Sequence, residues 1–150
     1  MIMERVRIPW NSWVVVCDGV KALTLRNDGD AELLNLTLVD SHFQPAPPTS
    51  ALGSDRPGRA FQSHGFNRSA EDETDLHAQM EAAFLSEVAE RLDKAVRKHA
   101  IKSLVLVAPP KALGLLRKRL SPAVLAVVAA EVAKDLARLS TPEIEKHLAG

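Results

Sequence analysis

Apolar residues near the start of the chain occur in short runs separated by turn signals, a pattern typical of strands. The runs cover residues 12–18, 20–26 and 32–39. Asp18-Gly19 and residues 27–30 carry the turn signals between them. In the third run we expect Leu34, Leu36 and Leu38 to share one face. The three runs predict an antiparallel meander.

Helical periodicity begins later in the chain. After a near capping box at 69–72, apolar residues recur every three or four positions and predict one long helix ending near His99. A strand at 104–108 and a short helix at 111–120 follow. The last predicted elements are a segment at 126–134, which fits a strand by its valines and a helix by its alanines, and a helix at 141–148 capped by Thr141.

With residues 126–134 taken as a strand, the order of elements predicts an α/β fold. It would have a mixed sheet of about five strands, starting with the antiparallel meander and flanked by helices. A length of 150 residues suffices for a sizeable core, so we expect a single domain over residues 1–150. The residues expected together in one core are Val14, Val16, Leu36, Phe84, Val88, Leu92, Leu104, Leu106 and Leu116.

The segment at about 40–74 lacks any periodic pattern and contains four prolines and three glycines. Such a long stretch without regular structure is uncommon inside a domain and is usually functional or disordered. Within it, Asp55, Arg56, Gly58 and Arg59 form a compact cluster. Guanidinium forks suit phosphate or carboxylate groups, and Asp55 can cap or orient one of them. The alternative is an ordinary solvated turn.

The net charge is zero, with 19 basic and 19 acidic side chains, so bulk charge argues for neither nucleic acid nor a membrane as a generic partner. The chain has no apolar stretch of membrane-spanning length and no apparent signal peptide, and it has one cysteine, Cys17. We therefore expect a cytoplasmic protein whose single thiol is buried and inert. The oligomeric state is left open.

Charge is nevertheless distributed unevenly. Residues 94–119 carry eight basic side chains and no acidic one, among them Lys111 and Arg117 after the predicted 104–108 strand. Ligands of open α/β sheets gather at the carboxyl ends of strands, so Lys111 and Arg117 could join Arg56 and Arg59 in an anion-binding site. The alternatives are cations that complement a helix dipole and the wet face of a short helix.

Catalytic chemistry has weaker support. His64, Asp75 and His77 could form an acid–base or metal site, but their spacing fits no zinc pattern, and surface histidines or a helix cap explain them more simply. No nucleophile elbow, P-loop or dinucleotide-binding glycine motif is present. We expect no cofactor, no metal and no catalytic residue.

The stretch Ala108-Pro109-Pro110-Lys111-Ala112-Leu113-Gly114-Leu115-Leu116-Arg117 resembles the bacterial host attachment protein family, whose members are labelled "protein required for attachment to host cells". The 13–19, 55–59 and 134–136 segments are similar to further family motifs in the same order. The resemblance also favours a strand at 126–134. It implies a fold like the middle domain of peptide-release factors and Pelota-type ribosome-rescue factors.

In release factors that fold carries a Gly-Gly-Gln loop, which this chain lacks, since Ala60-Phe61 precede Gln62. No paired base and nucleophile are visible either, so we favour a non-enzymatic module that binds the ribosome or structured RNA. Its anion- or RNA-binding site would comprise Asp55, Arg56, Gly58, Arg59, Lys111 and Arg117, with the four cations meeting phosphates. One alternative is a hydrolase of an ester or phosphoester, such as a peptidyl-tRNA-like substrate, with Asp55 and His64 or His77 as acid–base groups. Another is a protein-interaction factor that affects attachment indirectly.

Overall fold

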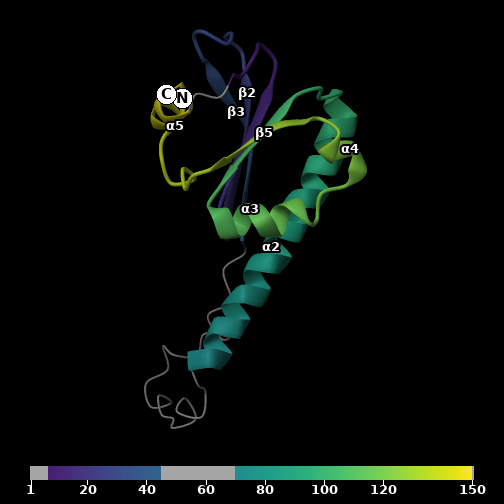
Figure 1. Ribbon diagram of the computed structural model, residues 1–150, viewed down its shortest axis with the longest axis vertical. Helices are drawn as coiled ribbons and strands as arrows, with labels where there is room; N and C mark the ends of the chain where they lie inside the picture. Colours follow the sequence, from purple (N-terminus) through teal and green to yellow (C-terminus); the bar gives the residue numbers. More distant parts are fainter. Residues whose placement is uncertain (1–6, 45–69, 150) are drawn as a thin grey trace.

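A computed structural model describes residues 7–44 and 70–149, and Figure 1 shows its helices and strands. The strands are β1 (Trp13–Cys17), β2 (Lys21–Asn27), β3 (Leu36–Phe43), β4 (Leu104–Ala108) and β5 (Val128–Ala133). The helices are α2 (Ala70–His99), α3 (Pro110–Arg117), α4 (Pro122–Leu125) and α5 (Thr141–Ala149). The strand assignment of 126–134 is thereby confirmed.

The strands form one mixed five-stranded sheet in the order β3-β2-β1-β4-β5. β1 pairs antiparallel with β2, and β2 with β3, which confirms the predicted meander. β4 lies parallel to β1 on its other side and β5 lies parallel to β4. The predicted α/β class and mixed sheet are therefore confirmed. The carboxyl ends of β1, β4 and β5 all lie at one edge of the sheet.

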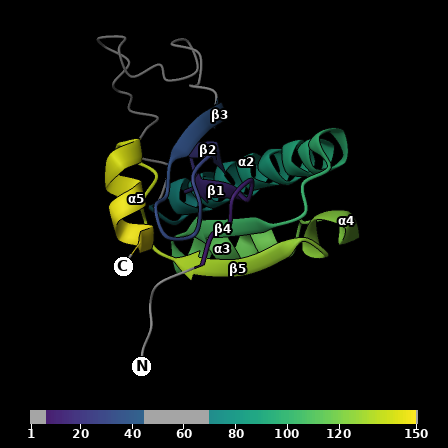
Figure 2. The same ribbon diagram turned by 90° about the horizontal axis from the view of Figure 1, so that it is seen from above.

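Helices cover both faces of the sheet, and this divides the core into two layers. Figure 2 shows α5 on one side of the strands and α2 with α3 on the other. β1 and β4 are buried along their whole length, so alternate side chains enter opposite layers. The prediction of one shared core was wrong in this respect: Val14, Val16 and Leu36 pack in the α5 layer, and the other predicted core residues pack under α2 and α3.

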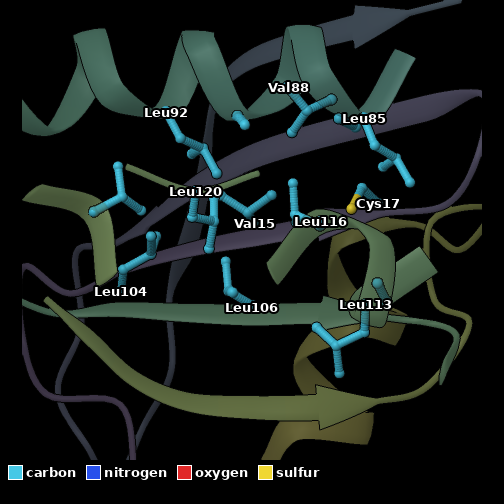
Figure 3. Packing of buried hydrophobic residues seen from close by; sticks show 14 of the residues in the cluster. Val15, Cys17, Leu85, Val88, Leu92, Leu104, Leu106, Leu113, Leu116 and Leu120 are labelled. Carbon is cyan, nitrogen blue, oxygen red and sulfur yellow. The ribbon is translucent and has the colours of Figure 1, made fainter. Parts of the chain in front are cut away.

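Leucine and valine side chains fill the layer between the sheet and α2 (Figure 3). Leu85, Val88 and Leu92 point from α2 toward Leu104 and Leu106 of β4. α3 completes this layer with Leu113 and Leu116, both buried, and Leu120 beyond its end is buried as well. The amino-terminal turns of α2 extend past the sheet in Figure 1, which agrees with the exposure of Leu76.

The third strand starts later than the predicted 32–39 run. The Asn27 side chain accepts hydrogen bonds from the backbone N–H groups of Gly29 and Asn35, and Asp30 accepts two more from within the turn. These bonds close residues 28–35 into one loop, so pairing begins only at Leu36. The strand then continues to Phe43, so residues 40–43 of the predicted 40–74 loop belong to β3. Residues 70–74 of that predicted loop belong to α2.

Two helix caps also differ from the prediction. Ser140, rather than Thr141, caps α5: its hydroxyl accepts from the Glu143 N–H, and Glu143 accepts from the Ser140 N–H, which is a capping box. Ser121 caps the short helix α4, and its hydroxyl also donates to Asp93 of α2 at 2.6 Å. The predicted end of the 111–120 helix is therefore followed directly by a helix start, which fastens α4 to α2.

Candidate functional site: a groove between α2 and the antiparallel strands

The predicted loop cluster falls outside the described residues. Asp55, Arg56, Gly58 and Arg59 all belong to the 45–69 segment, as does His64. The anion site predicted around them therefore stays a prediction. Its remaining members, Lys111 and Arg117, lie on α3 and can be placed.

Lys111 lies at the carboxyl edge of the sheet, in the first turn of α3 directly after β4, as the strand-end argument predicts. Its ammonium nitrogen is 3.7 Å from the Glu81 carboxylate of α2, and its side chain is largely exposed. Glu81 also lies against Gly19, where an added Cβ would meet the Glu81 side chain at 2.9 Å. Asp18 is occupied by the turn itself, since it accepts from the Val20 and Lys21 N–H groups. Lys111 is thus accessible, but it has an acidic neighbour.

Arg117 is held more closely by an acidic partner than Lys111 is. Both its Nε and an Nη nitrogen donate to the carboxylate of Glu131 on β5, a bidentate ion pair. The pair raises the pKa of Arg117 and lowers that of Glu131, chiefly through these hydrogen bonds. An anion at Arg117 would have to compete with Glu131. The side chain therefore serves to hold α3 on β5.

A concave site lies elsewhere, between α2 and the β1–β2–β3 half of the sheet. We call it the α2 groove and define it by Trp13, Thr24, Asp40, Arg91, Ala95 and His99. Its volume is about 230 Å³, and its floor includes Ala22, Val88 and Leu92. A mostly apolar pocket with a few convergent polar groups is the usual form of a ligand site.

A β-bulge in β3 brings polar side chains into this groove. The register shifts between Thr24 and Leu25, so that Leu38 pairs with Leu25 while Asp40 pairs with Thr24. Val39 is the extra residue, and beyond it Asp40 and His42 face α2. Without the shift, the alternation set by Leu36 and Leu38 would turn these two side chains to the other face.

Asp40 and His42 each meet a partner on α2. The Asp40 carboxylate is 2.6 Å from an Arg91 nitrogen, and both side chains are about half exposed. His42 lies 2.9 Å from the Glu87 carboxylate and stacks on the buried Phe84, with ring centroids 5.2 Å apart. These contacts hold the edge strand against the helix along one side of the groove.

The other side of the groove is formed where α2 ends. Ala100 has a left-handed backbone (φ 53°), and the Ile101 N–H bonds back to the Val96 carbonyl, which is a Schellman-type end. This end leaves the His99 ring beside the Trp13 indole, with centroids 5.0 Å apart and planes tilted by 33°. Trp13 is almost fully buried, so His99 presents the accessible aromatic face.

The mouth of the groove is cationic. A second hollow of about 250 Å³ shares Asp40, Arg91, Ala95 and His99 with the pocket and adds Lys94 and Lys98. Lys94 and Lys98 lie one helical turn apart and are exposed. Among the described residues neither has an ion-pair partner, whereas Arg97 pairs with Asp93. The two lysines are therefore free to meet an anion.

Lys94 and Lys98 belong to the basic run of residues 94–119, for which cations that complement a helix dipole were one interpretation. No sequence pattern brings them together with Trp13 or Asp40. Only the spacing of the two lysines was visible in the sequence.

Asp75 and His77, the acid–base candidates in the described part of the chain, lie exposed on the first turns of α2. No cluster of three or more metal-ligating side chains occurs among the residues described. Nor is any described helix both long and apolar enough to cross a membrane.

Fold and groove together define an open mixed-sheet α/β protein with a pocket of about 230 Å³ between α2 and the sheet. The chain belongs to the family described as "Protein required for attachment to host cells", whose sequence model matches residues 13–148. The family resemblance is thereby confirmed; the relation to the release-factor middle domain stays a prediction. No curated protein matches the chain.

Among solved structures, the chain is similar to the ethanolamine utilization protein EutJ from Carboxydothermus hydrogenoformans, at 12% identity and a TM-score of 0.41. The match covers 93% of this chain and 49% of that one, so the chain spans about half the length of EutJ. The family description names a phenotype and neither a ligand nor a reaction.

Proposed function

We propose that the protein is a non-enzymatic binding module for RNA, free or in the ribosome, and that the α2 groove is its phosphate-contacting surface. The observation that carries the proposal is the pair Lys94 and Lys98, exposed and without an acidic partner among the described residues, at the mouth of the groove. Two ammonium groups one turn apart, beside His99, suit the repeating negative charge of a nucleic-acid backbone.

Local charge supports this proposal better than the overall balance. The acidic residues of α2 precede Lys94 in sequence: Asp93 is occupied by Ser121 and Arg97, and Glu87 by His42. Glu90 lies exposed one turn before Lys94, outside the residues that line the groove and its mouth. The carboxylate that faces the groove, Asp40, is paired with Arg91. The mouth therefore keeps a net positive character although the whole chain is neutral.

The predicted loop cations belong to the same proposal as a second contact. Lys111 lies at the carboxyl edge of the sheet, whereas Lys94 and Lys98 share a hollow with His99, whose ring contacts Trp13 at the amino-terminal end of β1. An RNA strand bound at Lys111 would thus touch a different part of the molecule. Variants of the two sites separate these contributions.

The test is the binding of a single-stranded RNA and of ribosomes at a series of salt concentrations. Removing one phosphate-binding cation should flatten the slope of log affinity against log salt by about 0.7 for a single strand, so Lys94→Ala/Lys98→Ala should reduce it by about 1.4. Lys111→Ala should reduce it by about 0.7 if the strand-end site contributes.

Lys134→Ala/Lys146→Ala is the matched control. Both lysines are exposed and lie away from the groove, on the segment after β5 and on α5, so the same charge is removed elsewhere. This variant should keep the wild-type slope. A wild type without affinity for RNA or ribosomes at low salt, or equal reductions in the two double variants, would remove the proposal and leave a protein-interaction role.

A further inference from the structure

The α2 groove has features that phosphate binding alone does not require. A polyanion needs exposed cations, but the lysines here border a pocket of about 230 Å³ that penetrates to the sheet. The pocket floor is apolar, formed by Ala22 of β2 and by Val88 and Leu92 of α2. Apolar surface of this kind receives a flat or hydrophobic group, which a sugar–phosphate backbone lacks.

An aromatic face borders the pocket. His99 lies beside Trp13, and its ring is on the exposed side of the pair. Planar heteroaromatic rings stack on such faces, and the stacking tolerates different ring types because every base has a π-face. The apolar floor and the aromatic wall together suit a planar ring.

Polar groups on the opposite wall can bond the edge of such a ring. The Thr24 hydroxyl lies on β2, and the Asp40–Arg91 pair joins β3 to α2 along this side of the groove, with both side chains about half exposed. A hydroxyl, a carboxylate and a guanidinium offer both donors and acceptors, the combination that the edges of nucleobases require. The edge of a bound ring would form hydrogen bonds with the exposed side of the Asp40–Arg91 pair.

We infer that the α2 groove binds a nucleotide, with the base in the pocket between His99 and the Thr24 wall and the phosphate at Lys94 and Lys98. The inference rests on the proposed function for its phosphate contacts and adds the class of ligand. The nucleotide can be free or can be an unstacked residue of a single RNA strand. The bases of a duplex are stacked and paired, so a duplex cannot supply one.

Three ligands distinguish the sources: a nucleoside monophosphate, a short single-stranded RNA, and a duplex of the same length. Affinities are measured by titration at low salt, together with NMR shifts of the backbone amides of Thr24 and Ala95. The wild type should bind the single strand at least tenfold more tightly than the duplex. Both the monophosphate and the single strand should shift the two amides.

Ala95→Leu tests the pocket directly because Ala95 lines both hollows and a larger side chain there would intrude into them. It should weaken monophosphate binding at least tenfold and remove the preference for single strands, while the contacts of Lys94 and Lys98 to RNA persist. Ala83→Leu is the matched control, since it makes the same change at an exposed position of α2 outside the groove. Circular dichroism confirms that both variants are folded.

Thr24→Val keeps the side-chain volume but removes the hydroxyl. Because the base edge would lose a hydrogen bond to this hydroxyl, the variant should bind the monophosphate several-fold more weakly. Equal binding of single strand and duplex, with no amide shifts from the monophosphate, overturns the nucleotide site while the RNA proposal stands. Binding of the monophosphate without any RNA supports the site, with a free nucleotide as its ligand, and removes the RNA proposal. If Ala95→Leu binds the monophosphate as tightly as the wild type does, the nucleotide site is overturned.

Discussion

Cys17 lies at the end of the central strand β1 and is fully buried beneath α2. Burial, and then the charge of Asp18, raise the pKa of its thiol from 9.0 to about 12. The thiol therefore stays protonated at neutral pH, and a thiolate is the reactive form. Because the folded-state pKa is raised, ionisation also favours unfolding, so any stability effect of this group appears as a loss when the pH rises above about 9.

We expect native protein at pH 8 to react with a thiol reagent only as fast as it unfolds. The chain has one cysteine, so the colorimetric signal belongs to Cys17 alone. Protein in denaturant is the control and should react at once with one equivalent. Fast, complete reaction of the native protein would contradict the burial of this side chain.

Single residues differ in how far the sequence predicts their role. The inert Cys17 and the strand-end position of Lys111 follow from local apolar runs, and both were predicted. The Arg117–Glu131 pair joins a helix to a strand across a turn of the chain, and no local pattern reveals it. The same holds for Asp40, which reaches Arg91 only because β3 is bulged and lies under α2.

Helix α3 contains a glycine that its own packing does not explain. Gly114 is in the middle of the helix, and a Cβ added there would meet nothing within 4 Å. Glycine inside a helix costs about 1 kcal/mol relative to alanine, through the greater freedom of the unfolded chain. Gly114→Ala should therefore raise the free energy of unfolding by about 1 kcal/mol, measured by denaturant titration.

Gly29 provides the contrasting control. A Cβ there would lie 2.2 Å from the Leu33 carbonyl oxygen, within the hydrogen-bonded loop before β3. Gly29→Ala should therefore destabilise the protein, since backbone must move. If Gly114→Ala destabilises the protein as Gly29→Ala does, α3 requires its glycine. Loss of ligand binding in a stabilised Gly114→Ala would instead indicate that a partner approaches α3 closely.

Element types were predictable where periodicity is long or a run is bounded by strong turn signals, as for α2 and β1. The ends of the elements were less predictable, because side-chain hydrogen bonds determine where each element begins and ends. The Asn27 and Asp30 side chains delay β3 to Leu36, and Ser140 takes the cap position predicted for Thr141. The short helix α4 was missed because Ser-Pro is equally typical of a helix end and of a helix start.

At the scale of the whole molecule, the sequence predicted the mixed sheet and its meander but merged two core layers into one. Strands buried on both faces have continuous apolar runs, so β1 and β4 give no clue to which side chain enters which layer. Only the helices decide this: α2 and α3 cover one face, and Ile144 and Leu148 of α5 pack on the other.

The two layers lead to a prediction about additivity. Leu106 and Ile144 are both fully buried but lie on opposite faces of the sheet. Leu106→Ala should cost about 2–5 kcal/mol and Ile144→Val about 0.5–1.5 kcal/mol. Because the two side chains share no cavity, the double variant should lose the sum of the two within about 0.5 kcal/mol.

Val15 gives the matched comparison, since it is the cross-strand neighbour of Leu106 in the same layer. Val15→Ala combined with Leu106→Ala should depart from additivity, because the two truncations open one shared space that can collapse. All variants are measured by denaturant unfolding, with a common slope as the check on two-state behaviour. Coupling between Leu106 and Ile144 as large as that between Leu106 and Val15 would mean that the sheet does not separate the layers. A Leu106→Ala loss below about 1 kcal/mol would be incompatible with a close-packed position in the centre of the sheet.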